Sequence, residues 1–147
     1  MAVMASETFS SVAAPIQYAA QYAFLGNEEI KDYQAGCRRV SELVGQHVAQ
    51  ELRQAGCSVH DPEGGFYLFP NLGPCDDIED ICEQLLQQTG VAVLPGTDFG
   101  RAKHEGYFRL AYVDFDGEEA LKDPENALDH CPRVIEGVSK LVAWLNQ

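Results

Sequence analysis

The chain has 147 residues, of which 46% are hydrophobic, so it can form one domain with a core of its own. Its net charge of −13 argues against nucleic acid or an anionic membrane as a partner, because either polyanion would be repelled. No apolar run approaches the roughly 18 residues that span a bilayer, and the start, MAVMASETFSS, lacks the features of a secretory signal. The five cysteines are odd in number and widely spaced, which favours reduced thiols, and we expect a cytoplasmic protein.

Two helices are expected in the first third of the chain. Ser10 or Ser11 can cap the first helix, which runs to about Leu25. Asn27 can cap the second, whose apolar residues recur every three or four positions as far as about Ala55. Such a helix is long for a small domain, so we expect it to connect to another part of a protein.

Short strands alternate with helices in the rest of the sequence. Strands are expected at residues 57–60, 66–69, 91–94 and 107–113. An amphipathic helix is expected from Asp76 to Leu86, closed by Gly90, and another from Pro132 onward. The acidic segment 114–129 is expected to be a loop with at most a helical turn. This order predicts an α/β fold (α+β-like, two-layer) with three or four short strands packed with helices.

The motif YFRLAYV places one arginine in the middle of a strand. Its alternation puts Tyr107, Arg109, Ala111 and Val113 on one face and Phe108, Leu110 and Tyr112 on the other. The second set is bulky and apolar and is expected to face the core, so Arg109 points outward. A guanidinium held in this way can bind a carboxylate through two parallel charge-assisted hydrogen bonds. The alternative is that Arg109 only pairs with an acid on a neighbouring strand.

Other kinds of site have little support. The four histidines are scattered, no serine lies in a Gly-x-Ser-x-Gly motif, and no phosphate-binding glycine loop is present. Cys57, His60 and Cys75 do not show the two close ligand pairs of a structural zinc site, so no metal is expected. Thr97 and Asp98 could offer polar groups to a ligand, although capping of their own loop explains them equally well.

Four segments together resemble the class I/II aminotransferases, the pyridoxal-phosphate enzymes of fold type I. They are SSVAAPIQYAA (10–20), PEGGFYLFPNL (62–72), TGVAVLPGTDFG (89–100) and RLAYVDFDG (109–117). Their order and spacing resemble the C-terminal third of that family. The resemblance implies that Arg109 binds the α-carboxylate of the amino-acid or 2-oxo-acid substrate.

The resemblance also implies the surroundings of Arg109 and a domain division. Gly96, Thr97 and Phe99, in the loop PGTDFG, would line the mouth of the site. Residues 1–26 would be a helical remnant of the large domain, and 27–147 the small C-terminal domain, with 27–55 as the linking helix.

The lysine that forms the Schiff base in this family has no match here. The family's lysine lies upstream of the segment that SSVAAPIQ resembles, and no lysine of this chain has its sequence context: Lys31, Lys103, Lys122 and Lys140. No catalytic residue is therefore assigned. We expect a truncated product or a fragment that does not transaminate or bind pyridoxal 5'-phosphate alone.

Three functions remain open at this point. The first is the C-terminal part of an amino-acid aminotransferase, acting with a missing large domain or a dimer partner. The second is a non-catalytic interaction module derived from such an enzyme, and the third is a small domain that binds a 2-oxo acid through Arg109. Which amino acid is used, whether the chemistry is that of a related lyase or cyclopropane-forming enzyme, and the oligomeric state all stay open.

Overall fold

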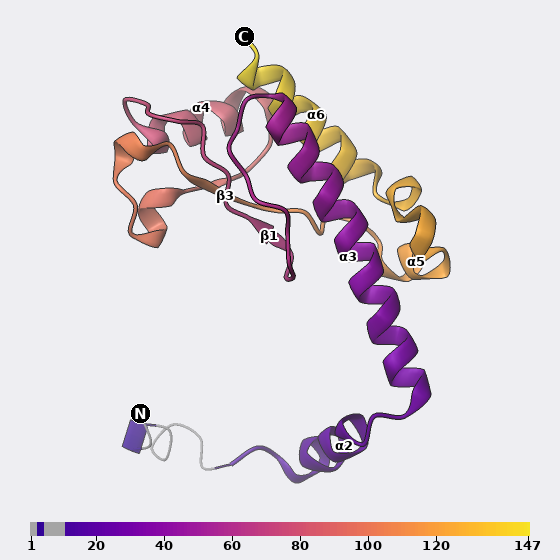
Figure 1. The fold of residues 1–147 in the computed structure, drawn as a ribbon. Helices are drawn as coiled ribbons and strands as arrows, with labels where there is room; N and C mark the ends of the chain where they lie inside the picture. Colours follow the sequence, from indigo (N-terminus) through magenta and orange to yellow (C-terminus); the bar gives the residue numbers. More distant parts are fainter. Residues whose placement is uncertain (1–2, 5–10) are drawn as a thin grey trace. The chain divides into compact units, whose positions relative to one another are not determined.

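The structure is a computed structural model that describes residues 3–4 and 11–147. The chain divides into two compact units, Met1–Ala35 and Gly36–Gln147 (Figure 1). The helices are α2 (Ala14–Phe24), α3 (Glu28–Gln54), α4 (Ile78–Thr89), α5 (Gly117–Lys122) and α6 (Pro132–Leu145). The strands are β1 (Tyr67–Leu68), β2 (Leu94–Pro95) and β3 (Phe108–Ala111), and the 3-10 helices are η1 (Gly96–Phe99), η2 (Lys103–Glu105) and η3 (Pro124–His130).

Helix α2, in the first unit, begins with a proline in its first turn and ends one residue before Leu25, as the sequence predicts. Its cap differs from the prediction. The N-cap residue is Ala13, which has no capping side chain, so Ser11 does not cap the helix; Ser10 lies outside the described residues. No residue of α2 is buried in the described part of the chain.

Helix α3 has the cap and the end that its sequence predicts. The Asn27 side chain accepts a hydrogen bond of 2.9 Å from the backbone N–H of Ile30, which satisfies one of the free donors of the first turn. Gly56 follows the helix at a φ of 88°, a conformation that glycine adopts without strain. Within the second unit the buried side of α3 is formed by Val40, Val44, Val48, Ala49 and Leu52.

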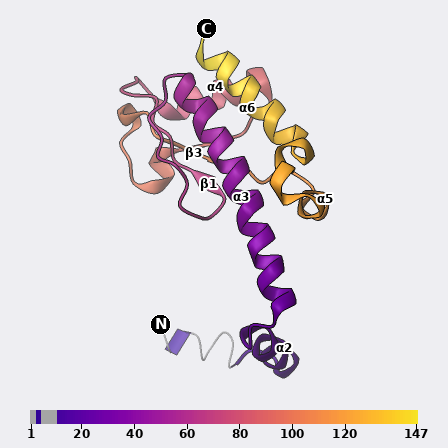
Figure 2. The same cartoon turned by 45° about the vertical axis from the view of Figure 1, so that its right-hand side comes forward.

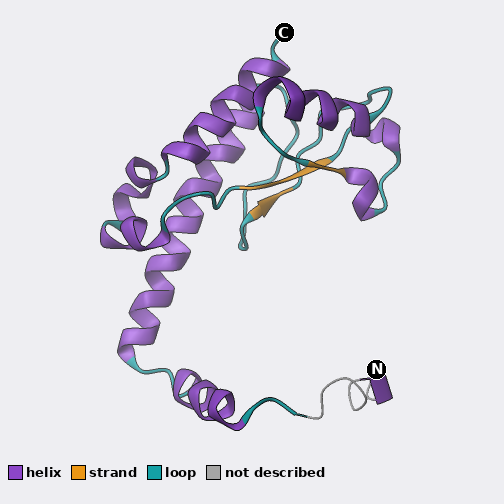
Figure 3. Ribbon diagram, turned by 180° about the vertical axis from the view of Figure 1, so that it is seen from behind, coloured by secondary structure: helices purple, strands orange, loops and turns teal. Residues whose placement is uncertain are grey.

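The second unit contains a three-stranded sheet with β3 in the middle. Strand β1 pairs with β3 on one side and β2 on the other, both antiparallel, so that Leu68 lies opposite Leu110 and Leu94 opposite Arg109. Seen from behind, the strands lie beside the helices (Figure 3). The two-layer arrangement of short strands and helices expected from the sequence is confirmed.

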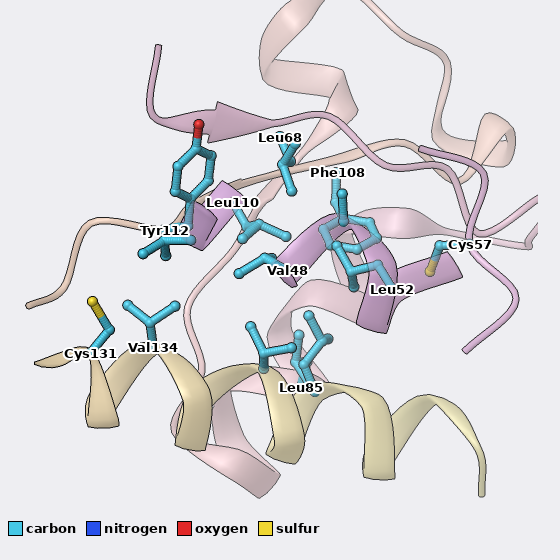
Figure 4. Packing of buried hydrophobic residues seen from close by; sticks show 14 of the residues in the cluster. Val48, Leu52, Cys57, Leu68, Leu85, Phe108, Leu110, Tyr112, Cys131 and Val134 are labelled. Carbon is cyan, nitrogen blue, oxygen red and sulfur yellow. The ribbon is translucent and has the colours of Figure 1, made fainter. Parts of the chain in front are cut away.

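The core lies on one face of this sheet. Phe108, Leu110 and Tyr112 are all buried, and they point toward α3 side chains such as Val48 and Leu52 (Figure 4). Helix α4 lies against α6 (Figure 2) and both contribute to the same core through Leu85 and Val134 (Figure 4). The alternation of β3 thus separates a buried face from an open face, as its sequence indicates.

Helix α4 has both predicted ends. The Asp77 carboxylate accepts a hydrogen bond of 2.9 Å from the Glu79 N–H, and Gly90 closes the helix in the left-handed conformation.

Three expected strands are much shorter than predicted, and of residues 66–69 only Tyr67 and Leu68 form β1. Residues 57–60 form only one bridge, between Ser58 and Asn71, and of residues 91–94 only Leu94 pairs with β3. For residues 91–94 the reason is that their partner β3 spans only four residues, which limits how far a neighbouring strand can pair.

The segment 114–129 is mainly helical, so the prediction of a loop was wrong. Asp116 accepts hydrogen bonds from the N–H groups of Glu118 and Glu119 and caps α5, and η3 follows directly. The residues that these turns bury most deeply are Ala120 and Ala127. Such small side chains do not produce the apolar periodicity by which an amphipathic helix is recognised.

Candidate functional site

Arg109 lies on the open face of the central strand. Its neighbours in the chain, Phe108 and Leu110, are buried and anchor the backbone, while Ala111 is exposed beside it. The guanidinium is therefore presented from a backbone that is fixed on its other side by the core. This is the placement that the period-2 pattern predicts.

Two aromatic rings lie against the Arg109 guanidinium. Its central carbon is 4.4 Å from the centroid of the Tyr67 ring and 4.6 Å from that of the Phe99 ring. Both distances lie within the range in which a cation is attracted to the face of an aromatic ring. Both rings are about half exposed, Tyr67 at 46% and Phe99 at 43%, so the cluster is open to solvent.

The loop that carries Phe99 is held against β3 by Gly96. The N–H of Gly96 donates a hydrogen bond of 2.7 Å to the carbonyl oxygen of Tyr107. A Cβ atom at position 96 would lie 2.7 Å from that same oxygen, which is closer than side chains and backbone approach each other. Only glycine therefore allows this approach, and it fixes the start of the 3-10 turn that ends at Phe99.

Thr97 interacts with helix α4. The pKa of Glu79 is lowered first by the Lys103 ammonium, which lies 2.6 Å from its carboxylate oxygen, and then by the Thr97 hydroxyl. Lys103 also lies 3.1 Å from a carboxylate oxygen of Asp77 and lowers the pKa of that group. This charged cluster joins the loop after Gly96 to the first turn of α4.

A row of aromatic contacts continues from Phe99 along the open face. Phe69 contacts Phe99 edge-on at 5.7 Å between ring centroids and stacks on Tyr107 at 5.3 Å. The Arg101 guanidinium lies over the Tyr107 ring at 4.4 Å. The contact of Tyr67 with Arg109 was not foreseen. The alternation in GFYLFP indicates that Tyr67 and Phe69 share the open face, but it does not show which ring reaches the guanidinium.

Arg109 differs from most cations of the chain in its lack of an acidic partner. Eight of the ten lysines and arginines form ion pairs. Among residues 3–4 and 11–147, Arg109 makes no ion pair and no side-chain hydrogen bond, and Arg38 is the other cation without an ion pair. The alternative in which Arg109 pairs with a cross-strand acid is thus not realised within the described part of the chain.

The guanidinium lies on a surface that the described residues leave open. One hollow of about 590 Å³ lies between α3 and the turn 62–65, and another of about 450 Å³ lies between α6 and residues 89–93. Arg109 lines neither of them. A ligand bound here would be covered on one side only by the residues that the structure describes.

The thiols and other metal-binding side chains form no metal site within residues 3–4 and 11–147. Burial raises the pKa of Cys57 and of Cys82 to about 11, so both thiols stay protonated and unreactive at neutral pH. All five cysteines are free. In the part of the chain that is described, no group of three or more metal-binding side chains is close enough to hold an ion, and no helix is long and apolar enough to cross a membrane.

The model of the family described as aminotransferase class I and II matches residues 1–120, a range that includes Arg109 and the loop of Phe99. The chain belongs to this family. The resemblance inferred from the four sequence segments is thereby confirmed.

Characterised relatives in the aminotransferase family are much longer than this chain. An aspartate aminotransferase of Pyrococcus horikoshii is 34% identical over 122 residues, which are 81% of this chain and 31% of the relative. An LL-diaminopimelate aminotransferase of Natranaerobius thermophilus is 36% identical over 104 residues, which are 69% of this chain and 25% of the relative. The chain therefore spans about a third or less of these relatives.

Solved aminotransferase structures share the fold. The crystal structure of an aspartate aminotransferase from Thermotoga maritima matches 98% of this chain and 32% of its own, with a TM-score of 0.65 and 24% identity. An aromatic aminotransferase from Pyrococcus horikoshii matches 92% of this chain and 35% of its own, with a TM-score of 0.64 and 27% identity. The described elements thus correspond to a part of the aminotransferase fold.

The aminotransferase family depends on pyridoxal phosphate. The surroundings of the four lysines of this chain indicate whether one of them could attach that cofactor. Covalent attachment needs a lysine whose amine is desolvated or otherwise deprotonated. Each of the four lysines is at least half exposed and lies in an ion pair, with Glu28, Glu79, Glu119 and Glu136 as partners. None of these four lysines therefore fits covalent attachment of the cofactor.

Proposed function

We propose that this chain is the C-terminal part of an amino-acid aminotransferase and that Arg109 binds the α-carboxylate of the amino acid or 2-oxo acid. The observation that carries the proposal is the state of its guanidinium. It projects from the open face of the sheet, and its N–H donors form no hydrogen bond or ion pair with the described residues. A carboxylate is the ligand whose two oxygens match two parallel donors of a guanidinium.

The open surface around Arg109 supports a shared site. In this proposal residues 1–26 belong to the large domain and 27–147 to the small domain, with α3 as the linking helix. The large domain or a dimer partner would cover the carboxylate and supply the chemistry. Gly96 and Phe99 would border the site, with Thr97 behind them against Glu79. The five free cysteines favour a reducing, cytoplasmic location.

Catalysis by the chain alone is not part of the proposal. Amino-group transfer requires an electron sink such as pyridoxal phosphate, and the ion-paired, exposed lysines of this chain are not suited to attach it. The role of this chain is to orient the substrate by its carboxylate. Fixing one end of a substrate lowers the entropic part of the barrier for whichever residues carry out the transfer.

Binding of 2-oxoglutarate to the purified chain tests the role of Arg109. Arg109→Gln removes the charge and the bidentate geometry, and we expect at least about a tenfold loss of affinity, because hydrogen bonds to charged groups are worth about 1.5–3 kcal/mol. Titration calorimetry and the NMR shift of the Arg109 Nε–Hε group measure the effect.

Arg38→Gln is the matched control for this titration. It makes the same change of charge at Arg38. This arginine lies on helix α3 and also forms no ion pair among the described residues. Its affinity should equal that of the wild type. Equal affinity of Arg109→Gln and the wild type, or no binding by the wild type, would remove the support for a carboxylate site at Arg109.

A second candidate function is a non-catalytic interaction module. The observation that favours it is the surface of α2, on which several large apolar side chains are more than half exposed: Ile16, Tyr18, Tyr22 and Phe24. Apolar patches of this kind mark surfaces that bind another protein.

A further inference from the structure

The Arg109 side chain is long and flexible, so fixing its guanidinium in one orientation has an entropic cost. An arginine has about 2 kcal/mol of rotamer entropy, which is lost when the guanidinium is fixed in one orientation. Resident acids commonly fix such a group, but no described acid pairs with Arg109. An acid would also compete with an anionic ligand for the same N–H donors. The side chain therefore needs another restraint if it is to bind a carboxylate from a prepared position.

Two rings from separate elements supply contacts of the required kind. Tyr67 comes from β1, where it lies opposite Ala111, and Phe99 comes from the end of η1. Both rings lie within 4.6 Å of the guanidinium carbon. The face of an aromatic ring attracts a cation but offers no carboxylate or carbonyl oxygen, so this attraction leaves the N–H donors available.

The two rings are themselves supported. Phe99 is restrained through the close approach of Gly96 to Tyr107 and through the edge of the Phe69 ring. Tyr67 is held by the pairing of β1 with β3, and its ring contacts that of Phe66 at 4.5 Å. The restraint on Arg109 therefore comes from β1 and from η1, which contact the same strand.

We propose that Tyr67 and Phe99 are positioning residues that hold the Arg109 guanidinium in its carboxylate-binding orientation before a ligand arrives. This inference rests on the proposed function of Arg109 and adds the two residues on which its orientation depends. Binding then requires less loss of entropy in the Arg109 side chain, which is the general advantage of a preorganised site. Neither ring contacts the reacting atoms in this role.

The mobility of the Arg109 side chain in the ligand-free chain tests the inference directly. Tyr67→Leu and Phe99→Leu each remove one ring while keeping an apolar side chain. We expect the NMR order parameter of the Arg109 Nε–Hε group to fall toward the flexible range, below about 0.6, in each variant. The affinity for 2-oxoglutarate should fall about threefold to tenfold in the same variants.

The conservative variants Tyr67→Phe and Phe99→Tyr keep the rings and should restore both the order parameter and the affinity. Phe24→Leu is the control for loss of an exposed ring, because Phe24 is exposed, lies in α2 and is not one of the rings that contact Arg109 or support Tyr67 and Phe99. It should leave Arg109 as ordered as in the wild type. The backbone amide spectrum of each variant shows that the fold is kept.

The outcomes separate this inference from the proposed function. Unchanged order parameters in both leucine variants overturn the positioning role, whatever the affinity. An ordered guanidinium in a wild-type chain that does not bind 2-oxoglutarate overturns the carboxylate site. Reduced order and reduced affinity in both leucine variants, restored by the conservative variants, support the inference.

Discussion

Arg109 keeps its charge available because its neighbours on the open face are aromatic or small. The chain carries 23 acidic residues, yet the contacts of this guanidinium in the described structure are with Tyr67 and Phe99. Placement on the middle strand of the sheet gives the backbone rigidity, and the rings supply attraction without neutralising the charge. Arg109 thus has a rigid backbone and guanidinium N–H groups that form no hydrogen bond with the described residues.

For single residues, the sequence predicted on which face of the sheet Arg109 lies but not which side chains contact it. Period-2 alternation over YFRLAYV was sufficient to place Arg109 on the open face, since three bulky residues mark the opposite face. The contact with Tyr67 depends on the register between β1 and β3, which join segments far apart in the chain. Register depends on tertiary packing, so a single sequence does not reveal it.

Lys103 offers a residue-scale prediction about pH. It lowers the pKa of Asp77 and of Glu79, so their pairing with Lys103 stabilises the fold above their ordinary pKa values of 3.8 and 4.5. That stability is lost as the pH falls through the lowered values. Lys103→Met should therefore reduce the urea midpoint at pH 7, and the difference from the wild type should shrink toward pH 2.5.

Lys103→Arg keeps the positive charge and is the control for this pH series. It should retain most of the wild-type dependence on pH, although its geometry differs from that of lysine. Denaturation curves recorded from pH 7 to pH 2.5 by far-UV circular dichroism make the comparison. A constant difference between wild type and Lys103→Met across this range would contradict the assignment.

Helices whose ends carry a capping side chain and a terminal glycine could be predicted from the sequence. Asn27 and Asp77 cap their helices as expected, and Gly56 and Gly90 end them in the left-handed region. Helix α5 and the turns of η3 were missed because their most deeply buried residues are alanines, although Asp116 before two glutamates was a usable capping signal. The lengths of β1 and β2 were overestimated because pairing depends on the span of β3.

A pair of glycines gives an element-scale prediction. Gly90 and Gly106 have nearly the same φ, 77° and 73°, but a Cβ at Gly90 meets open space while one at Gly106 would overlap the carbonyl oxygen of Gly73. Gly90→Ala should cost about 1 kcal/mol of the free energy of unfolding, from backbone strain alone. Gly106→Ala should cost about 3 kcal/mol, because the loops after β1 and before β3 must also separate.

Urea denaturation of the two alanine variants measures this difference directly. Each variant carries the same chemical change at a left-handed position, so Gly90→Ala serves as the control for strain. Equal losses in the two variants would show that the loop around Gly73 moves away freely, contrary to its close contact with Gly106.

For the molecule as a whole, the family match shows which family the chain belongs to, while the short coverage of its relatives limits any statement about substrate. The chain spans 31% of one curated relative and 25% of another, and those relatives are named for aspartate and for LL-diaminopimelate. Substrate choice depends on side-chain pockets, and Arg109 lines neither of the two large hollows in this chain. The open face is therefore compatible with the proposed carboxylate ligand but contains no hollow at Arg109 that would select its side chain.

The apolar surface of α2 leads to a prediction about association. With Ile16 at 59% and Phe24 at 90% exposed, the first unit should self-associate or bind other apolar surfaces. Sedimentation velocity should show a mass that rises with protein concentration. The double variant Ile16→Ser, Phe24→Ser should remain monomeric, whereas Gln21→Ser, a polar change in the same helix, should behave as the wild type. A wild type that is monomeric at all concentrations would count against the interaction module.

The two-residue length of β1 and β2 has a consequence for how this sheet can be covered. Both outer strands of the sheet are this short, and an incoming strand needs a row of unpaired backbone groups as a template. Each edge offers too few such groups for strand addition or for growth into fibrils. Any protein that covers the exposed face would therefore contact it through side chains, and substitutions could change those contacts without disturbing the backbone pairing of the sheet.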